Sequence, residues 1–335
     1  MADTPSIHAV LVNHSTSLFV ELAIRSYYVT HPDDRRLRFT VMDNASRDDT
    51  GPLRDYLASC HIPFLQSGFD PATQQANSHG EVLQAFVRDN ADCDVYLLLD
   101  ADICFVHPGT LDRMLEELAA DPAAWAVQAW SRRTSRVLFK QRECIPQAQR
   151  DADWEDRARV LYQHVIAQEA FGAPPEGIVE GPRPFHMPDL PDNVRDLPIE
   201  TSVRTLRPRC EPCCTVVANT PIFRRVNEHI GFSGAAIHAN DPKVAGVYDT
   251  MGLMTAVMNS HERHYLLSSL GVLHPWQVAY NRGVPAVDVK HAQGAALLDR
   301  YRAGDIPDFA CDDWMTPDYL AWVIEREGYE PSSKD

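Results

Sequence analysis

The chain has 335 residues, of which 44% are hydrophobic and 23% are charged. A chain of this length and composition can bury the core of one large globular domain or of two joined ones. Its formal net charge is -16 at pH 7, which argues against nucleic acid or an anionic membrane as a partner, because both require a basic surface. An anionic small molecule would need local positive charge or a bound cation.

The N-terminal segment MADTPSIHAVLV lacks a basic region followed by a long apolar one, and no run of about 18 apolar residues occurs. We therefore expect a cytoplasmic protein without a transmembrane segment, whose eight cysteines are thiols. The spacing of Cys210, Cys213 and Cys214 is compatible with zinc. A structural zinc site needs a second pair of ligands at matching spacing, and none is evident, so we favour buried thiols on a strand.

The first 120 residues alternate strand-like apolar runs with amphipathic helical ones. This alternation predicts a mostly parallel sheet with helices on both faces, which is an α/β three-layer sandwich. Thr110 is the predicted N-cap of the last of these helices. In chain order we predict a strand at 7–12, a helix at 17–28, a strand at 37–43, helices at 51–60 and 79–90, a strand at 94–100 and a helix at 109–121.

From residue 131 onward the regular alternation of strand-like and helical patterns ends. We predict a helix at 154–171, a proline-rich loop at 172–198, a strand at 213–218, a helix at 221–230 capped by Thr220 and Gly231, a helix at 249–261, a strand at 265–273 and a final helix from Thr316. Three units are predicted, at 1–130, at 131–287 and, as a C-terminal helical segment, at 288–335.

Three predicted strands end in polar clusters, namely 13–15, 43–50 and 100–102. Open α/β sheets bind ligands beyond the carboxyl ends of their strands. Asp100 and Asp102, two residues apart and facing solvent, can hold one Mg²⁺ or Mn²⁺ ion, which in turn can hold the phosphates of a nucleotide. The same residues are also typical of an ordinary turn. The polar ends of the neighbouring strands favour the binding site.

These segments resemble a known family. AVLVNHSTSLFVELAIRSY, FTVMDNASRDDTG and VYLLLDADICFVHPGTLDRML are similar, in order and spacing, to the nucleotide-binding segments of family 2 glycosyltransferases of the GT-A fold. The resemblance covers roughly the first 120 residues. It implies a GT-A-like sandwich, a divalent metal (Mn²⁺ or Mg²⁺) and a UDP-, GDP- or dTDP-sugar donor.

The resemblance also implies roles for residues of the first half. It places Asn13 and His14 beside the base, and Asp43 with Ser46 at the nucleoside. Asp100 and Asp102 match the DxD motif, with Asp102 as the firmer metal ligand and Asp100 nearer the ribose or the water around the metal. Residues 67–81 match a segment that often carries a basic residue facing the diphosphate, and this chain offers only Gln74, Gln75 and His79 there.

The second half must supply the acceptor site and, by the resemblance, a late histidine that contacts the metal. His274, just after a predicted strand, is the candidate ligand. An inverting transfer needs a carboxylate to deprotonate the acceptor hydroxyl, and we select Asp249, with Asp241 and then Glu211 as further candidates. Asp249 is equally placed to be an ordinary helix cap.

The predicted function is thus metal-dependent transfer of a sugar to a hydroxyl of a small-molecule or glycan acceptor, with inversion, by a protein that could be a homodimer. Three alternatives stay open. A haloacid dehalogenase-like phosphatase would carry its Asp-x-Asp near the N-terminus. A sugar-nucleotide pyrophosphorylase would have a glycine-rich loop after the first strand. A non-catalytic nucleotide or carbohydrate binder would retain the aspartates and consume no donor.

Overall fold

The central feature of the computed structural model is one mixed sheet. The structure describes residues 5–32, 34, 36–69, 78–133, 210–232, 263–274 and 285–304, with the short pieces 235–237, 246–248, 250–252, 254–255 and 258 between them. Within this part the sheet has eight strands: β1 (Ile7–Asn13), β2 (Leu37–Asp43), β3 (Phe64–Gln66), β4 (Val95–Leu99), β5 (Cys104–Phe105), β6 (Ala124–Arg133), β7 (Cys214–Ala218) and β10 (His264–His274). The pieces β8 (Ala235–Ile237) and β9 (Gly246–Tyr248) pair separately.

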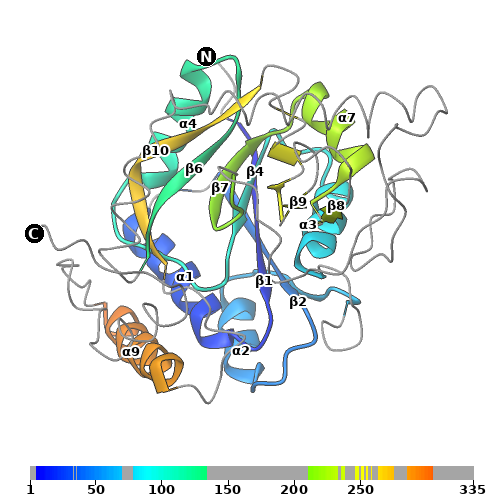
Figure 1. Cartoon of the computed structure of the whole chain (residues 1–335). Coiled ribbons are helices and arrows are strands. Elements are labelled where there is room, and N and C mark those ends of the chain that lie inside the picture. Colours follow the sequence, from blue (N-terminus) through cyan, green and yellow to red (C-terminus); the bar gives the residue numbers. More distant parts are fainter. Residues whose placement is uncertain are drawn as a thin grey trace, which may run out of the picture.

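The strand order is β3-β2-β1-β4-β7-β6-β10-β5 (Figure 1). The pairs β2 with β3, β1 with β2, β1 with β4, and β6 with β10 are parallel. Strand β7 runs antiparallel to β4 and β6, and β5 runs antiparallel to the end of β10. Because β1, β2 and β4 run in the same direction, their polar carboxyl ends meet at one edge of the sheet.

Helices cover both faces of the sheet, so the chain forms three layers (Figure 1). They are α1 (Ser17–Thr30), α2 (Gly51–Ser59), α3 (Ser78–Asp89), α4 (Thr110–Ala120), α7 (Pro221–Ile230) and α9 (Pro285–Arg302). One core joins one face of the sheet to α3 and α7, and another joins the opposite face to α1, α2 and α4. Alternate residues of β1 enter the two cores, which explains why its apolar run is unbroken.

The predicted α/β sandwich with a mostly parallel sheet is confirmed, and the predicted strands and helices of the first 120 residues are all found. The assignment of Thr110 as an N-cap is wrong. Gly109 takes that position with φ 74°, a left-handed conformation that a β-branched residue disfavours. Thr110 is instead the first helical residue, and its hydroxyl donates to the carbonyl of His107 at 2.9 Å.

In the second half, β7, α7 and β10 lie where the sequence predicts them. Thr220 accepts a hydrogen bond from the backbone N–H of Phe223, as a capping residue does. The predicted helices at 154–171 and from Thr316, and the loop at 172–198, lie outside the described residues, and the helix at 249–261 is described only in part. The boundaries at 130 and 287 stay predictions, while strands from both sides of residue 130 share one sheet.

Helix α9 docks onto α1 and the end of the sheet. The buried carboxylate of Glu21 accepts hydrogen bonds from Arg302 at 2.7 and 3.0 Å and from Arg25 at 2.7 Å. At Gly294 the two helices are so close that an added Cβ would lie 2.7 Å from the ring of Phe19. The apolar face of α9 thereby covers β5 and the end of β10. None of the described helices has the length and hydropathy that a bilayer span requires.

We expect the substitution Gly231→Ala to destabilise the fold. Gly231 ends α7 with φ 69° and ψ -160°, a region of backbone space open almost only to glycine, where another residue costs about 1–3 kcal/mol. An added Cβ would also approach the side chain of Gln84 to 3.0 Å. Gly109→Ala is the matched control, because it meets no atom within 4 Å. Urea denaturation should give a larger loss for Gly231→Ala, and equal losses would contradict the account.

Candidate metal and nucleotide site

Three side chains meet where the DxD segment passes the end of β10. The antiparallel pairing of Leu273 with Cys104 sets His274 beside the segment that precedes β5. The Nε2 atom of His274 lies 3.2 Å from Oδ1 of Asp102 and 3.5 Å from Oδ2 of Asp100. One ligand atom from each residue lies within 4.8 Å of the others, so the three could hold one metal ion.

The backbone around the two aspartates is held by the core. The N–H of Asp100 donates to the carbonyl of Cys213 at 2.9 Å, and Ala101 and Ile103 are buried in the core on the α1 face. The prediction that both carboxylates face solvent is wrong for Asp102, whose side chain is 10% exposed against 28% for Asp100. The reason is that His274, at the end of β10, packs against the Asp102 carboxylate, a contact that local sequence does not reveal.

Electrostatics make this cluster receptive to a cation. Burial alone would lower the pKa of His274, but Asp102, together with Cys213 and Asp100, raises it to about 10. Burial raises the pKa of Asp100 and is only partly offset by His274 and His79. For Asp102 the burial effect is outweighed by His274 and Lys290, and its pKa is lowered. The protonated imidazole therefore supplies, in the metal-free protein, the positive charge beside the two carboxylates that a bound metal ion would otherwise supply.

Two atoms of the cluster indicate that a ligand fits there. Oδ2 of Asp102 and Nδ1 of His274 are buried and have no hydrogen-bond partner among the described residues. Buried polar atoms are rarely left in that state unless water, an ion or a ligand satisfies them. Two carboxylates and one imidazole are also an acceptable ligand set for Mn²⁺ and, through the carboxylates, for Mg²⁺.

The ends of β1 and β2 form the neighbouring part of the site. Asn13 is fully buried, and its amide donates to Oδ1 of Asp43 at 3.0 Å and to Ser17 at 3.2 Å. Its carbonyl oxygen accepts from the backbone and hydroxyl of Thr16. Asn13 therefore holds Asp43 and the start of α1 in place.

The two loops that follow these strands bind to each other. The backbone of Ser15 donates to the hydroxyl of Ser46 at 2.9 Å, and the backbone of Arg47 donates to the hydroxyl of Ser15 at 2.8 Å. Ser15 and Ala45 both have left-handed backbones, with φ of 57° and 53°. Such strain in two adjoining loops at the carboxyl edge of a sheet is typical of a functional site.

Two predicted histidines also lie here. Nδ1 of His14 contacts the carbonyl of Asn44 at 2.7 Å, which ties the first loop to the second. His79 belongs to the first turn of α3, and its Nε2 lies 3.9 Å from Oδ1 of Asp100. The structure thus brings the described candidates of the sequence to one edge of the sheet. Asp249 and Asp241 lie outside the described residues.

Sequence reasoning missed one charged residue of the site. Lys290, on α9, is almost fully buried and lowers the pKa of Asp102. Glu211, a candidate base in the sequence, is buried as well and contributes to the raised pKa of Asp100. The lysine could not be found from a motif, because only the docking of α9 brings it to the cluster.

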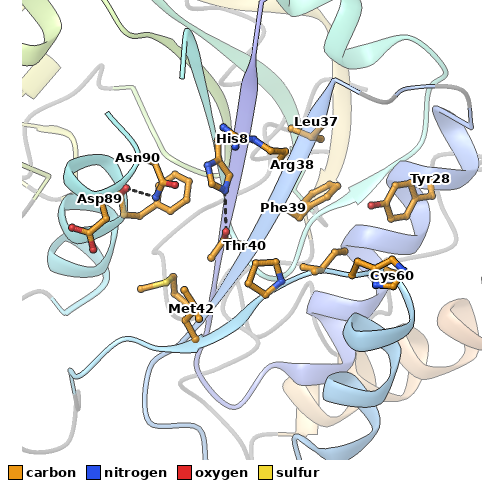
Figure 2. A pocket seen from close by; sticks show the side chains of 15 residues that line it. His8, Tyr28, Leu37, Arg38, Phe39, Thr40, Met42, Cys60, Asp89 and Asn90 are labelled. Atoms are coloured by element: carbon orange, nitrogen blue, oxygen red, sulfur yellow. Dashed lines mark hydrogen bonds between the residues drawn. The ribbon is translucent and has the colours of Figure 1, made fainter. Parts of the chain in front are cut away.

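A cavity of about 630 Å³ lies at the other end of β1 and β2. Figure 2 shows His8 directed at Thr40, and their side chains are 2.9 Å apart. Burial lowers the pKa of His8 to about 4, so this histidine is neutral at pH 7. None of the candidate site residues lines the cavity. It is therefore separate from the candidate site.

No protein-family model matches the sequence, and no curated protein matches it. Among solved structures, a mannosyltransferase from Pyrobaculum calidifontis, in complex with GDP-Man and Mn²⁺, is 12% identical with a TM-score of 0.47, over 98% of this chain and 77% of that one. Glucosyl-3-phosphoglycerate synthase from Mycobacterium tuberculosis, in complex with Mn²⁺, UDP and glucosyl-3-phosphoglycerate, is 13% identical with a TM-score of 0.41, over 91% and 82%. TarS from S. aureus is 8% identical with a TM-score of 0.41, over 96% and 72%.

Proposed function

We propose that the chain is a metal-dependent glycosyltransferase that takes a sugar from a nucleotide-sugar donor. The observation that carries this proposal is the cluster of Asp100, Asp102 and His274 beside Asp43 at the carboxyl edge of the sheet. The ends of β2 and β4 are separated only by β1, which is about 10 Å at the usual strand spacing. That distance suits a nucleoside at one end and its diphosphate at the other.

Each group has a role in this proposal. Asp43, held by Asn13 and joined to the Ser46 loop, accepts hydrogen bonds from the nucleoside. Asp102, Asp100 and His274 hold the divalent cation, which neutralises charge on the departing diphosphate when it is bound. His79, in the first turn of α3, faces the same phosphates. The chain's acidic surface makes such local positive charge necessary for an anionic donor.

The proposed base, Asp249, takes the proton of the acceptor hydroxyl as its oxygen attacks the anomeric carbon. Inversion at that carbon belongs to the same proposal. Glu211 is the described alternative, since its carboxylate is buried within electrostatic range of Asp100. Asp249→Asn should spare nucleotide binding and abolish transfer, whereas the same result for Glu211→Gln alone would move the assignment to Glu211.

The test of function is a donor panel. UDP-, GDP- and dTDP-sugars are incubated with the protein, Mn²⁺ and simple sugar or hydroxy-acid acceptors, and release of free nucleoside diphosphate is measured. We expect release from one class of donor, dependent on Mn²⁺. Exchange of pyrophosphate into the nucleotide sugar would instead indicate a pyrophosphorylase. Binding of a donor without any consumption would indicate a non-catalytic binder.

A further inference from the structure

The two strands that bring the metal ligands together form a very short ladder. Strand β5 has only two residues, and its antiparallel pairing with β10 sets Cys104 opposite Leu273. Asp102 lies two residues before Cys104, and His274 directly follows Leu273. The pairing of β5 with β10 therefore sets the separation of these two ligands. A strand shorter than the usual three to ten residues needs support from other elements to keep its place.

Helix α9 supplies that support from a distant part of the chain. Two leucines and Tyr301 of α9 pack in one apolar cluster with Cys104 and Leu273, the two residues that face each other across the short ladder. The hydroxyl of Tyr301 donates to the backbone carbonyl of Phe105 at 3.3 Å, and it accepts from the thiol of Cys104 at 3.6 Å. Both strands next to the metal ligands thus depend on α9 for part of their packing.

Arg302, at the end of α9, ties this helix to α1, which lies beside it (Figure 1). Its guanidinium donates to both carboxylate oxygens of Glu21 on α1, from Nε at 3.0 Å and from Nη2 at 2.7 Å. The side chain of Glu21 is 4% exposed and that of Arg302 is 42% exposed. An arginine that bonds both oxygens of a carboxylate makes a strong and directional contact. Undocking of α9 would leave the buried carboxylate without this partner.

The packing between the two helices is also close. An added Cβ at Gly294 of α9 would lie 2.7 Å from the ring of Phe19 on α1, and the ring of His291 meets the same phenylalanine edge-on at a centroid distance of 5.0 Å. Such close packing resists partial displacement, because a shift of either helix opens a gap or creates an overlap. Helix α9 is therefore expected to dock or undock as one unit.

We propose that the docking of α9 on α1, latched by Arg302 and Glu21, is coupled to metal binding, so that the docked helix and the cation stabilise each other. Arg302 is on this account a positioning residue for the metal site. The inference rests on the proposed function, because the cation is the one at the cluster of Asp100, Asp102 and His274. The ligands meet where β5 is paired with β10, and α9 packs on that pair. By linkage, whatever docking adds to metal affinity, the metal adds to docking.

The first measurement is Mn²⁺ binding to metal-free full-length protein by calorimetry. Arg302→Gln should weaken Mn²⁺ binding about fivefold or more, as is usual for coupled sites. Arg302→Lys, which keeps the charge and loses the two-bond geometry, should restore part of the affinity. Arg25→Gln is the matched control. Arg25 donates to the same carboxylate at 2.7 Å from within α1, so its loss removes a partner of Glu21 without removing the tie to α9, and Mn²⁺ affinity should be unchanged.

The second measurement is hydrogen exchange of the backbone amides of α9 in the unaltered protein, with and without saturating Mn²⁺. Coupling predicts that Mn²⁺ slows exchange throughout α9 by the same factor by which docking raises Mn²⁺ affinity. Exchange in α2, which also packs on α1, is the internal reference and should not respond. A helix with a purely structural role would exchange at the same rate with and without the metal, which would overturn the coupling without any variant.

Gly294→Ala tests the same docking without a change in charge, and it covers the case in which Arg302→Gln does not fold. Its added Cβ meets Phe19 and should wedge the helices apart, so that α9 exchanges faster and Mn²⁺ binds more weakly. The proposal is overturned if the variants leave α9 exchange unchanged, or if they loosen α9 while Mn²⁺ binds as it does to the unaltered protein. If the unaltered protein binds no Mn²⁺ at all, the proposed function fails, and the inference fails with it.

Discussion

The Asp102→Asn variant is expected to lose metal-dependent turnover of the donor by a factor of about 100 or more. The substitution removes the carboxylate that lies 3.2 Å from His274 and whose second oxygen is buried without a partner among the described residues. An amide is a poor ligand for a hard cation in place of a carboxylate. The amide also no longer raises the pKa of His274, so the substitution alters the histidine ligand as well as the carboxylate.

Asp121→Asn provides the matched control. Asp121 also pairs with a histidine, His264, at 2.6 Å, but this pair lies at the start of β10, at the end opposite His274. The control loses an aspartate from a histidine pair without touching the cluster, so its turnover should be retained. Steady-state rates with Mn²⁺ and a consumed donor, compared at a temperature where both variants are folded, measure the effect. Full activity in Asp102→Asn would remove the metal role from this residue.

Affinity for the metal should rise about tenfold for each pH unit between pH 6.5 and 8.5. The raised pKa of His274, about 10, means that its imidazole carries a proton throughout this range in the metal-free protein. A metal can bind Nε2 only after that proton leaves, so binding releases one proton and is favoured by high pH. Calorimetry in buffers of different ionisation enthalpy counts the proton directly.

The metal-free protein should show the opposite trend in stability. A folded-state pKa raised above the usual 6.5 stabilises the fold fully below pH 6.5, and this stabilisation is lost as the pH rises toward 10. The melting temperature without metal should therefore fall over that range, and the increase on adding metal should grow. His274→Gln should flatten both trends, whereas His264→Gln should leave the metal dependence unchanged. A pH-independent metal affinity would show that His274 is not a ligand.

Local patterns were sufficient for most of the first half. The strands β1, β2 and β4 and the helices between them follow from apolar periodicity, and Thr220 and Gly231 mark α7 because their capping chemistry is local. The short strands β3 and β5 were missed because they carry too few residues for any period. Strand β6 was missed because its start follows α4 closely and its role depends on pairing with β7 and β10.

The residues of the site likewise fall into two groups: those that a local motif predicts and those that only the tertiary structure brings together. Asp100 and Asp102 could be found because they form a motif two residues apart, and His274 because it ends a strand. The burial of Asp102 against His274 and the nearby charge of Lys290 arise from contacts across more than 80 residues of chain, for which one sequence contains no local signal. A left-handed turn at Gly109 likewise displaced the predicted cap, because glycine can start a helix without a side chain.

The central claim is that the cluster of Asp100, Asp102 and His274 holds the cation through which a nucleotide binds. A thermal-shift titration of the metal-free protein with UDP, GDP, dTDP and CDP, each with and without Mn²⁺, tests it directly, because a ligand that binds only the folded state raises its melting temperature. The account predicts that at least one nucleoside diphosphate stabilises the protein with Mn²⁺ and not without it, and that Asp102→Asn removes this dependence. Stabilisation that is the same with and without Mn²⁺, or that survives in Asp102→Asn, would contradict it.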